Sequence, residues 1–315
     1  MVRWKPGRRS TNIEDRRGQG PARGGGLGGL PFPINLPTGG KGCLGLGGGT
    51  LGIIVTVALL LLNGGDVLSG GGSGSGGFPI GPDIELPGAP SAQGEPLPGA
   101  PDADDELVDY MSFVLDDVQA TWREEFTRAD ARYEDATLVL FTGAVDSGCG
   151  FAQSAAGPFY CPLDSKMYLD LDFFRELRDR FDAPGDFAQA YVLAHEIGHH
   201  VQNVLGINAD VRRQQQREPD DANELSVRQE LQADCYAGIW AHSTFERDLL
   251  EKGDVEEGLA AAAAVGDDRI QRETTGRVDP ESFTHGTSKQ RQHWFDRGFS
   301  SGDTDRCDTF AVDRV

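Results

Sequence analysis

The sequence predicts a helix-rich α+β domain with a small sheet, preceded by one transmembrane helix and a disordered linker. Three observations lead to this prediction. Apolar residues recur at helical spacing over much of 104–315, two short apolar runs within it are typical of strands, and an uncharged stretch lies nearer the N terminus. The 315 residues include 43 Gly and 17 Pro, which indicates that part of the chain lies outside any globular domain.

The first segment, residues 1–43, is basic and lacks apolar periodicity, so we expect a disordered cytoplasmic tail. It carries eight basic and two acidic side chains, although the whole chain has a formal net charge of −21. The acidic remainder argues against nucleic acid as a partner, because the phosphate backbone requires a basic surface.

Residues 44–62 form the predicted transmembrane helix. These 19 residues contain no charge, and at about 1.5 Å per residue they just cross a hydrocarbon core about 30 Å thick. A secretory signal peptide fits less well, because the preceding segment is too long and no small-residue cleavage site follows. The positive-inside rule predicts a single-pass plasma-membrane protein with a cytoplasmic N terminus and an extracytoplasmic C-terminal domain. Residues 63–103, rich in Gly and Ser and then in Pro, are expected to be a linker to the domain 104–315.

The domain is expected to open with a long helix, because its apolar residues from Leu107 to Phe126 form one helical stripe. Short apolar runs predict strands at 137–141 and 167–171, and helical spacing returns at 172–182. Further helices, ended by glycines at 206, 253 and 276, are predicted at 186–205, 223–248, 254–274 and 287–300.

Four cysteines follow the predicted span, where an extracytoplasmic location favours disulfides. Three pairings are possible. A short loop bearing Gly and Pro favours Cys149 with Cys161, which leaves Cys235 with Cys307. The alternative is free buried thiols or metal ligands, although none of the spacings is C-x2-C.

Residues 195–199 read His-Glu-Ile-Gly-His within a predicted helix. His195 and His199 are one turn apart, so their ring nitrogens can converge on one Zn²⁺. Glu196 lies about 100° around the helix from His195, where it can reach a water on the metal rather than the metal. Gln202 and Leu205 stand where a metzincin has Gly and His, so a third ligand must come from elsewhere.

Glu230 and Asp234 are the candidates for completing this site. They lie four residues apart on one face of a predicted helix. Glu230 is the predicted third ligand, and Asp234 is expected to accept the second N–H of a zinc histidine, as carboxylates often do in zinc enzymes. The alternative is an ordinary solvated acidic face.

These motifs resemble the YpfJ-like neutral zinc metallopeptidase family of single-span membrane proteins. The similar segments are 8–17, 149–150, 157–162, 168–171, 195–202, 230–238, 283–286 and 307–310. The resemblance implies a zincin-like metallopeptidase domain, a Zn²⁺ cofactor and a peptide or protein substrate. The layout of the zinc site on two helices is also similar to that of the wider gluzincins, which favours Glu230 over the other carboxylates as a ligand.

The expected mechanism uses Glu196 as general base for a zinc-activated water. His285 is our candidate donor to the oxyanion, ahead of Tyr236. We expect His200 to pack or hydrogen-bond away from the metal, and His242 and His293 to be surface or core residues. The run 167–171 is a candidate sheet edge for an extended peptide.

The main functional hypothesis is a membrane-tethered zinc metalloendopeptidase. Two alternatives remain open: a non-proteolytic, metal-stabilised binding or chaperone-like domain, and a zinc hydrolase of a non-protein amide. An intact His-Glu-x-x-His motif argues against the first alternative, because a structural site has no use for the glutamate.

Overall fold

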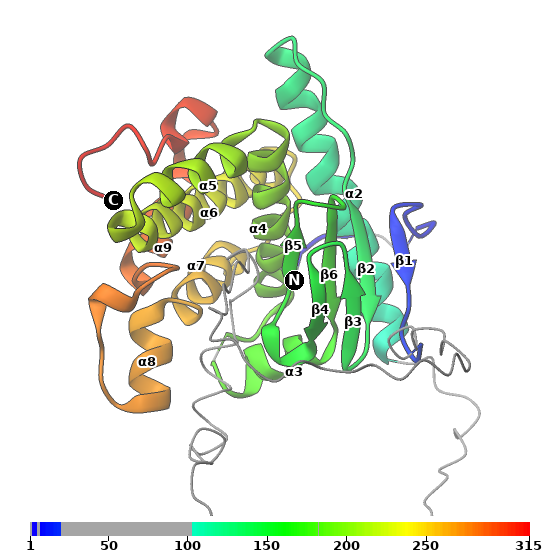
Figure 1. Ribbon diagram of the computed structural model, residues 1–315. Helices are drawn as coiled ribbons and strands as arrows, with labels where there is room; N and C mark the ends of the chain where they lie inside the picture. Colours follow the sequence, from blue (N-terminus) through cyan, green and yellow to red (C-terminus); the bar gives the residue numbers. More distant parts are fainter. Residues whose placement is uncertain (1, 5–6, 20–102, 182) are drawn as a thin grey trace, which may run out of the picture.

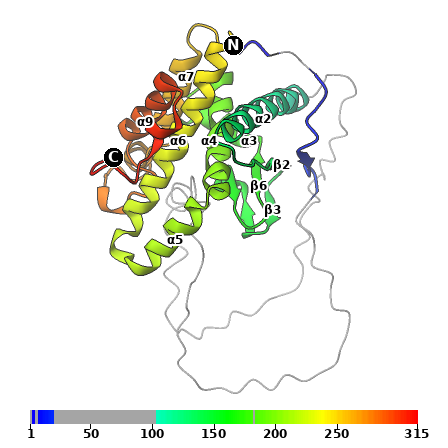
Figure 2. The same cartoon turned by 90° about the horizontal axis from the view of Figure 1, so that it is seen from above.

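The computed structural model describes residues 2–4, 7–19, 103–181 and 183–315, and it shows the predicted helix-rich α+β architecture (Figure 1). Most helices lie to one side of a small sheet in both views (Figures 1 and 2). The helices are α2 (Ala103–Arg128), α3 (Asp172–Asp179), α4 (Asp186–Val204), α5 (Ile207–Arg217), α6 (Ala222–Glu246), α7 (Asp254–Ala264), α8 (Asp267–Thr275) and α9 (Ser288–Ser301). The strands are β1 (Ile13–Asp15), β2 (Thr137–Phe141), β3 (Ala144–Ser147), β4 (Gly150–Gln153), β5 (Phe159–Cys161) and β6 (Lys166–Asp170).

The predicted membrane span, 44–62, and almost all of the predicted linker lie outside these described ranges. Within the described ranges, no helix combines the length and the apolar character that a membrane crossing requires.

The main sheet has the strand order β1-β2-β6-β5. Strand β2 pairs in parallel with both β1 and β6, whereas β5 pairs antiparallel with β6. Because side chains alternate along a strand, Leu138 and Leu140 face the large core under the helices, while Val139 and Phe141 face a second small core that also contains Val145 of the β3–β4 hairpin. Since β5 pairs with Met167 and Tyr168 of β6, the expectation that 167–171 forms a sheet edge is wrong for these two residues.

Helices α4 and α6 approach each other closely at Gly198. A Cβ atom there would lie 2.9 Å from the carbonyl oxygen and 3.0 Å from the Cα of Ala233. The same holds between α6 and α9, where a Cβ at Gly298 would lie 2.0 Å from the carbonyl oxygen of Cys235. These glycines let three helix backbones touch, so polar side chains on α4, α6 and α9 share one buried region.

Two disulfides are present, and they follow the favoured pairing: Cys149 with Cys161, and Cys235 with Cys307. The first staples the hairpin region to β5. The second joins the middle of α6 to the C-terminal segment, where Cys307 is completely buried.

Two helix predictions need correction. The predicted helix 254–274 is divided into α7 and α8, because the chain turns near Gly266 to meet the start of α9. The Ser288 hydroxyl donates to the Ala263 carbonyl at 2.7 Å, and the Ser288 amide donates to Asp268 at 2.7 Å. Helix α5 was not predicted, since its sequence after the first residue is almost entirely polar.

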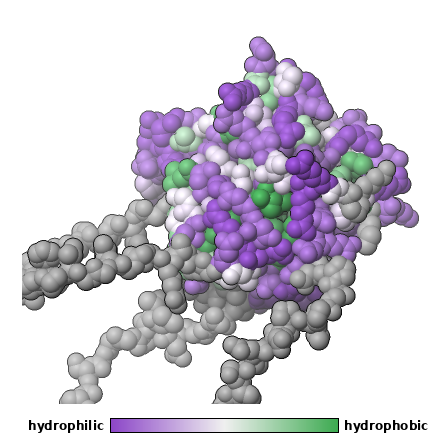
Figure 3. All heavy atoms as spheres, turned by 90° about the vertical axis from the view of Figure 1, so that its right-hand side faces the viewer, coloured by the Kyte–Doolittle hydropathy of each residue, from purple (hydrophilic) through white to green (hydrophobic). Residues whose placement is uncertain are grey.

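The expectation of a disordered tail is wrong for residues 2–4 and 7–19. Strand β1 forms an edge of the main sheet, beside β2 (Figures 1 and 2). The side of the molecule where β1 lies is largely hydrophilic (Figure 3). Strand β1 escaped prediction because it has three residues, of which only Ile13 is apolar.

Candidate metal centre

Helices α4 and α6 bring His195, His199 and Glu230 together. Their candidate ligand atoms all lie within 4.8 Å of one another, and all three side chains are buried. One carboxylate oxygen of Glu230 lies 3.2 Å from Nε2 of His195, and the other lies 3.4 Å from Nε2 of His199. Two imidazole nitrogens and a carboxylate facing one point match the ligands of a catalytic zinc site.

The far side of each imidazole ring is held by a hydrogen-bonding partner. Nδ1 of His195 lies 2.9 Å from Asp234, the partner that the sequence predicts. Nδ1 of His199 lies 2.9 Å from the side-chain oxygen of Gln202, whose amide in turn donates to the Gln229 carbonyl at 2.7 Å. Both rings therefore present Nε2 to Glu230. The role of Gln202 was not predicted, because the motif shows only that position 202 lacks the glycine of a metzincin.

Arg291 of α9 is a second site residue that sequence reasoning missed. Its guanidinium is fully buried and binds Asp234 through two nitrogens, at 2.8 and 2.9 Å. The Tyr191 hydroxyl also donates to Asp234. No local pattern distinguishes Arg291 from the many other arginines of the chain, because its position depends on how α9 packs against α6.

Glu196 is buried beside the three candidate ligands, with 3% of its surface exposed. Neither of its carboxylate oxygens has a hydrogen-bond partner among the described residues. Burial raises the pKa of Glu196, because the charged form loses its solvation. An unpartnered buried acid next to two histidines and a glutamate fits a centre that holds zinc and a reactive water, since that water would supply the acid with a hydrogen-bond partner.

A small cavity of about 10 Å³ lies against Glu196. Its wall includes His195 and Arg291 together with apolar side chains, among them Phe173 and Val265. A cavity of this size has room for about one water molecule.

The charges of the site are strongly coupled. Burial opposes protonation of His195, but the Asp234 and Glu230 carboxylates outweigh it and raise the pKa of His195 to about 9. Burial likewise opposes protonation of His199, and Glu230 outweighs it and raises the pKa of that ring. The pKa of Glu230 lies well below its usual range, because the two histidines overcome the effect of burial. The carboxylates therefore favour a positive charge where the rings meet, as a cation-binding site requires.

His285 lies in the loop between α8 and α9, with 7% of its surface exposed. Asp267 fixes this loop by accepting the backbone amide of His285 at 2.7 Å, and another of its oxygens lies 3.1 Å from Nδ1 of the ring. His285 contributes to the lowered pKa of Glu230, after the larger contributions of His199 and His195.

The other aromatic candidates have structural contacts. Tyr236 is buried against Trp122, with ring centroids 5.1 Å apart. His200 lies 2.9 Å from the Tyr160 hydroxyl and 2.6 Å from a backbone carbonyl, in agreement with the predicted hydrogen-bonding role. His242 contacts the carbonyl of a residue in α9, and the ring of His293 lies near that of Trp294.

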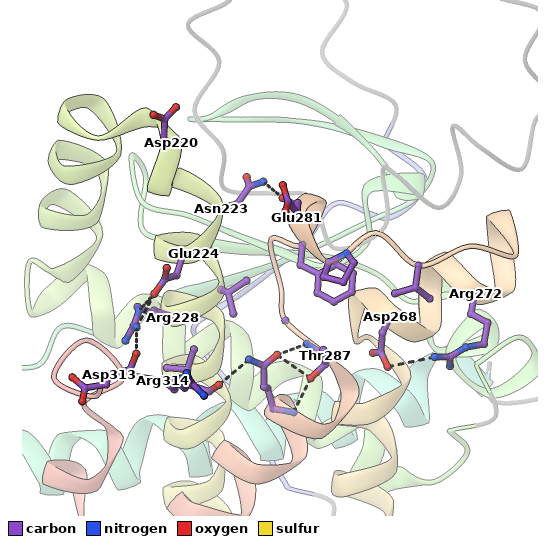
Figure 4. A pocket seen from close by; sticks show the side chains of 17 residues that line it. Asp220, Asn223, Glu224, Arg228, Asp268, Arg272, Glu281, Thr287, Asp313 and Arg314 are labelled. Carbon is purple, nitrogen blue, oxygen red and sulfur yellow. Dashed lines mark hydrogen bonds and ion pairs between the residues drawn. The ribbon is translucent and has the colours of Figure 1, made fainter.

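A pocket of about 900 Å³ lies between α6, α8 and the C-terminal segment (Figure 4). Its labelled side chains include Glu224, which pairs with Arg228, and Asp268, which pairs with Arg272. None of the three candidate ligands lines it. At Gly286 the 283–287 loop lies close to α6, since a Cβ there would be 3.2 Å from Val227, so this pocket borders the loop that carries His285.

A helix-rich fold that buries two histidines and a glutamate at one point is what the zinc-peptidase class of proteins requires. The chain belongs to the family described as "Putative neutral zinc metallopeptidase", whose match covers residues 2–310. It is 42% identical over 310 residues to "Uncharacterized protein YpfJ" of Escherichia coli K12, covering 98% of this chain and 99% of that protein.

Two mycobacterial relatives show a shorter match. The chain is 48% identical over 209 residues to an uncharacterised protein of Mycobacterium tuberculosis H37Rv, covering 62% of this chain and 68% of that protein. An uncharacterised protein of Mycobacterium bovis shows the same identity and coverage. No solved structure matches the chain.

Proposed function

We propose that the protein is a zinc-dependent peptidase that hydrolyses internal peptide bonds. The observation that carries this proposal is the convergence of His195, His199 and Glu230 beside a buried glutamate, Glu196, whose two carboxylate oxygens lack partners in the described structure. A purely structural metal site prefers a fourth protein ligand and gains nothing from such an acid.

His195, His199 and Glu230 would hold the zinc ion. When bound, zinc makes a water molecule more acidic and polarises a substrate carbonyl. Glu196 accepts the proton of the attacking water at its carboxylate and delivers it to the leaving amine nitrogen. The raised pKa of Glu196 suits its role as a base, because a carboxylate with a higher pKa accepts the proton of water more readily.

The surrounding residues support this chemistry by orientation. Asp234 and Gln202 fix the two imidazole rings, so that their Nε2 atoms stay aligned without a large entropic cost on metal binding. We assign His285 as donor to the oxyanion, since it is buried in the 283–287 loop, which lies against α6, and its Nδ1 lies 3.1 Å from Asp267.

The substrate we propose is a peptide or protein, and we propose that residues 44–62 tether the enzyme to a membrane. The membrane proposal rests on the sequence alone. Cleavage of a non-protein amide uses the same chemistry, so the substrate class must come from experiment.

The test uses the purified full-length chain loaded with zinc and incubated with a mixed peptide library. We expect cleavage that a chelator abolishes and that added zinc restores. The substitution Glu196→Gln should lower the rate by about 10²–10⁴-fold while zinc stays bound. Glu273→Gln, on the exposed surface of α8, is the matched control and should leave the rate unchanged.

Three results would contradict the proposal. Zinc bound at one ion per chain with no cleavage of any peptide would favour the binding-domain alternative. Hydrolysis restricted to cell-wall amides would instead favour the non-protein substrate. Cleavage by Glu196→Gln at the wild-type rate would remove the proposed general base.

A further inference from the structure

The N-terminal residues are built into the domain, although more than eighty residues separate the two in sequence. Strand β1 aligns Ile13 with Leu138 and Asp15 with Leu140 of β2. Its ladder is extended at both ends, because the Leu138 amide donates to the Asn12 carbonyl and the Arg16 amide to the Leu140 carbonyl, each at 2.8 Å. These backbone hydrogen bonds form only when β1 and β2 lie side by side.

Side chains before and within β1 strengthen the contact. The Ser10 hydroxyl donates to Asp116 of α2 at 2.6 Å, and its backbone amide donates to the Ser112 hydroxyl. The side-chain amide of Asn12 donates to the Asp135 carboxylate at 2.9 Å. Glu14 pairs with Lys166 of β6. The segment therefore makes specific contacts with α2, with the loop before β2 and with the sheet.

The first residues dock at a second place, next to the helix that carries the metal-site histidines. Val2 is 5% exposed, and its amide donates to the side chain of Asp186, the first residue of α4, at 2.7 Å. The Arg3 amide donates to the Leu249 carbonyl at 2.8 Å. The ring of Trp4 lies 5.4 Å from that of Tyr110. Residues 2–4 and strand β1 therefore contact the domain at two separate places, which argues against an incidental contact.

The basic side chains of this segment are also used by the fold. Arg3 pairs with Asp248 at 2.8 Å, and Arg9 pairs with Asp105 and Asp109 of α2. Arg17 pairs with the neighbouring Asp15.

The predicted single-pass orientation, with a cytoplasmic N terminus and the domain on the other side, is incompatible with these contacts. It would place residues 2–19 and the domain on opposite sides of a hydrocarbon core about 30 Å thick. The disulfides Cys149–Cys161 and Cys235–Cys307 assign the domain to an oxidising compartment. We infer that residues 2–19 lie outside the cytoplasm with the domain, docked as the edge strand of its sheet. This inference does not depend on the proposed peptidase activity.

The first test locates the N terminus in spheroplasts that express the full-length chain with Cys43→Ser, which leaves only the disulfide-bonded cysteines. Arg8→Cys supplies an exposed thiol in the N-terminal segment, and Ser301→Cys supplies one in the domain. A membrane-impermeant maleimide should label both variants equally in intact spheroplasts. Labelling of Arg8→Cys that rises more than tenfold only after lysis would overturn the inference.

The second test asks whether the docked strand exists in the cell. In the same background, Ser10→Cys with Ser112→Cys should form a disulfide that changes gel mobility under non-reducing conditions. Asn12→Cys with Asp135→Cys is a second pair, in case the first variant fails to fold. Ser10→Cys with Ser301→Cys is the control and should not cross-link, because α9 and β1 lie on opposite sides of the domain (Figures 1 and 2). Absence of cross-linking in both test pairs would overturn the docking.

Discussion

The substitution Arg291→Met tests whether the buried ion pair behind His195 supports the metal centre. Arg291 and Asp234 are both fully buried and joined by two hydrogen bonds, at 2.8 and 2.9 Å. Methionine fills much of the space but leaves Asp234 with an uncompensated charge. Removing one partner of a buried pair costs about 3–5 kcal/mol. For a domain of this size that corresponds to a fall in Tm of about 6–20 °C.

The assay is thermal unfolding of the metal-free protein, followed by zinc titration at a temperature where the variant remains folded. Zinc affinity should fall about 10–100-fold, because Asp234 no longer orients His195 correctly. Arg247→Met is the matched control: Arg247 pairs with Asp117 but is 42% exposed, so its loss should cost less than about 1 kcal/mol. If Arg291→Met behaved like Arg247→Met in both measurements, the proposed support of His195 would be refuted.

Three further predictions concern pH, packing and the disulfides. The pKa of His195 rises from 6.5 to about 9 on folding, so its contribution is fully present below pH 6.5 and is lost as pH rises through 9. The Tm of the metal-free protein should therefore fall between pH 6.5 and 9, and a Tm that rises there would contradict this. Gly198→Ala would bring a methyl group to 2.9 Å from the Ala233 carbonyl, so it should cost about 1–3 kcal/mol and weaken zinc binding; calorimetry showing neither effect would refute the close packing. Replacing Cys235 and Cys307 by serine opens a loop with a sequence separation of 72 and should lower the free energy of unfolding by about 4 kcal/mol. Replacing Cys149 and Cys161, separated by 12, should lower it by about 3 kcal/mol. Denaturant unfolding that gave the reverse order would contradict the chain-entropy explanation.

The metal centre was largely predictable because its geometry is local. Residues four apart on a helix share a face whatever the rest of the fold does, so His195 with His199 and Glu230 with Asp234 could be grouped from sequence. That the two helices would meet followed from chemistry, since two histidines need a third ligand. The contact itself depends on Gly198, whose lack of a side chain lets α4 touch α6.

The parts that escaped prediction depend on distant contacts. Arg291 reaches Asp234 only because α9 packs against α6 at Gly298, and nothing in its local sequence indicates this. Strand β1 is too short to show a periodic pattern, and its stability comes from β2 and α2. The basic composition of the first residues favoured a solvated tail, whereas Arg9 in fact pairs with carboxylates of the domain.

The most direct test of the metal centre is X-ray absorption at the zinc edge, measured on the purified full-length protein. We predict one zinc per chain bound by two imidazoles and by oxygen ligands, with a zinc–nitrogen distance of about 2.0–2.1 Å. Glu230→Ala should remove the ion or weaken its binding severely. A sulfur ligand in the spectrum, or full zinc occupancy in Glu230→Ala with an unchanged spectrum, would contradict the His195, His199 and Glu230 site.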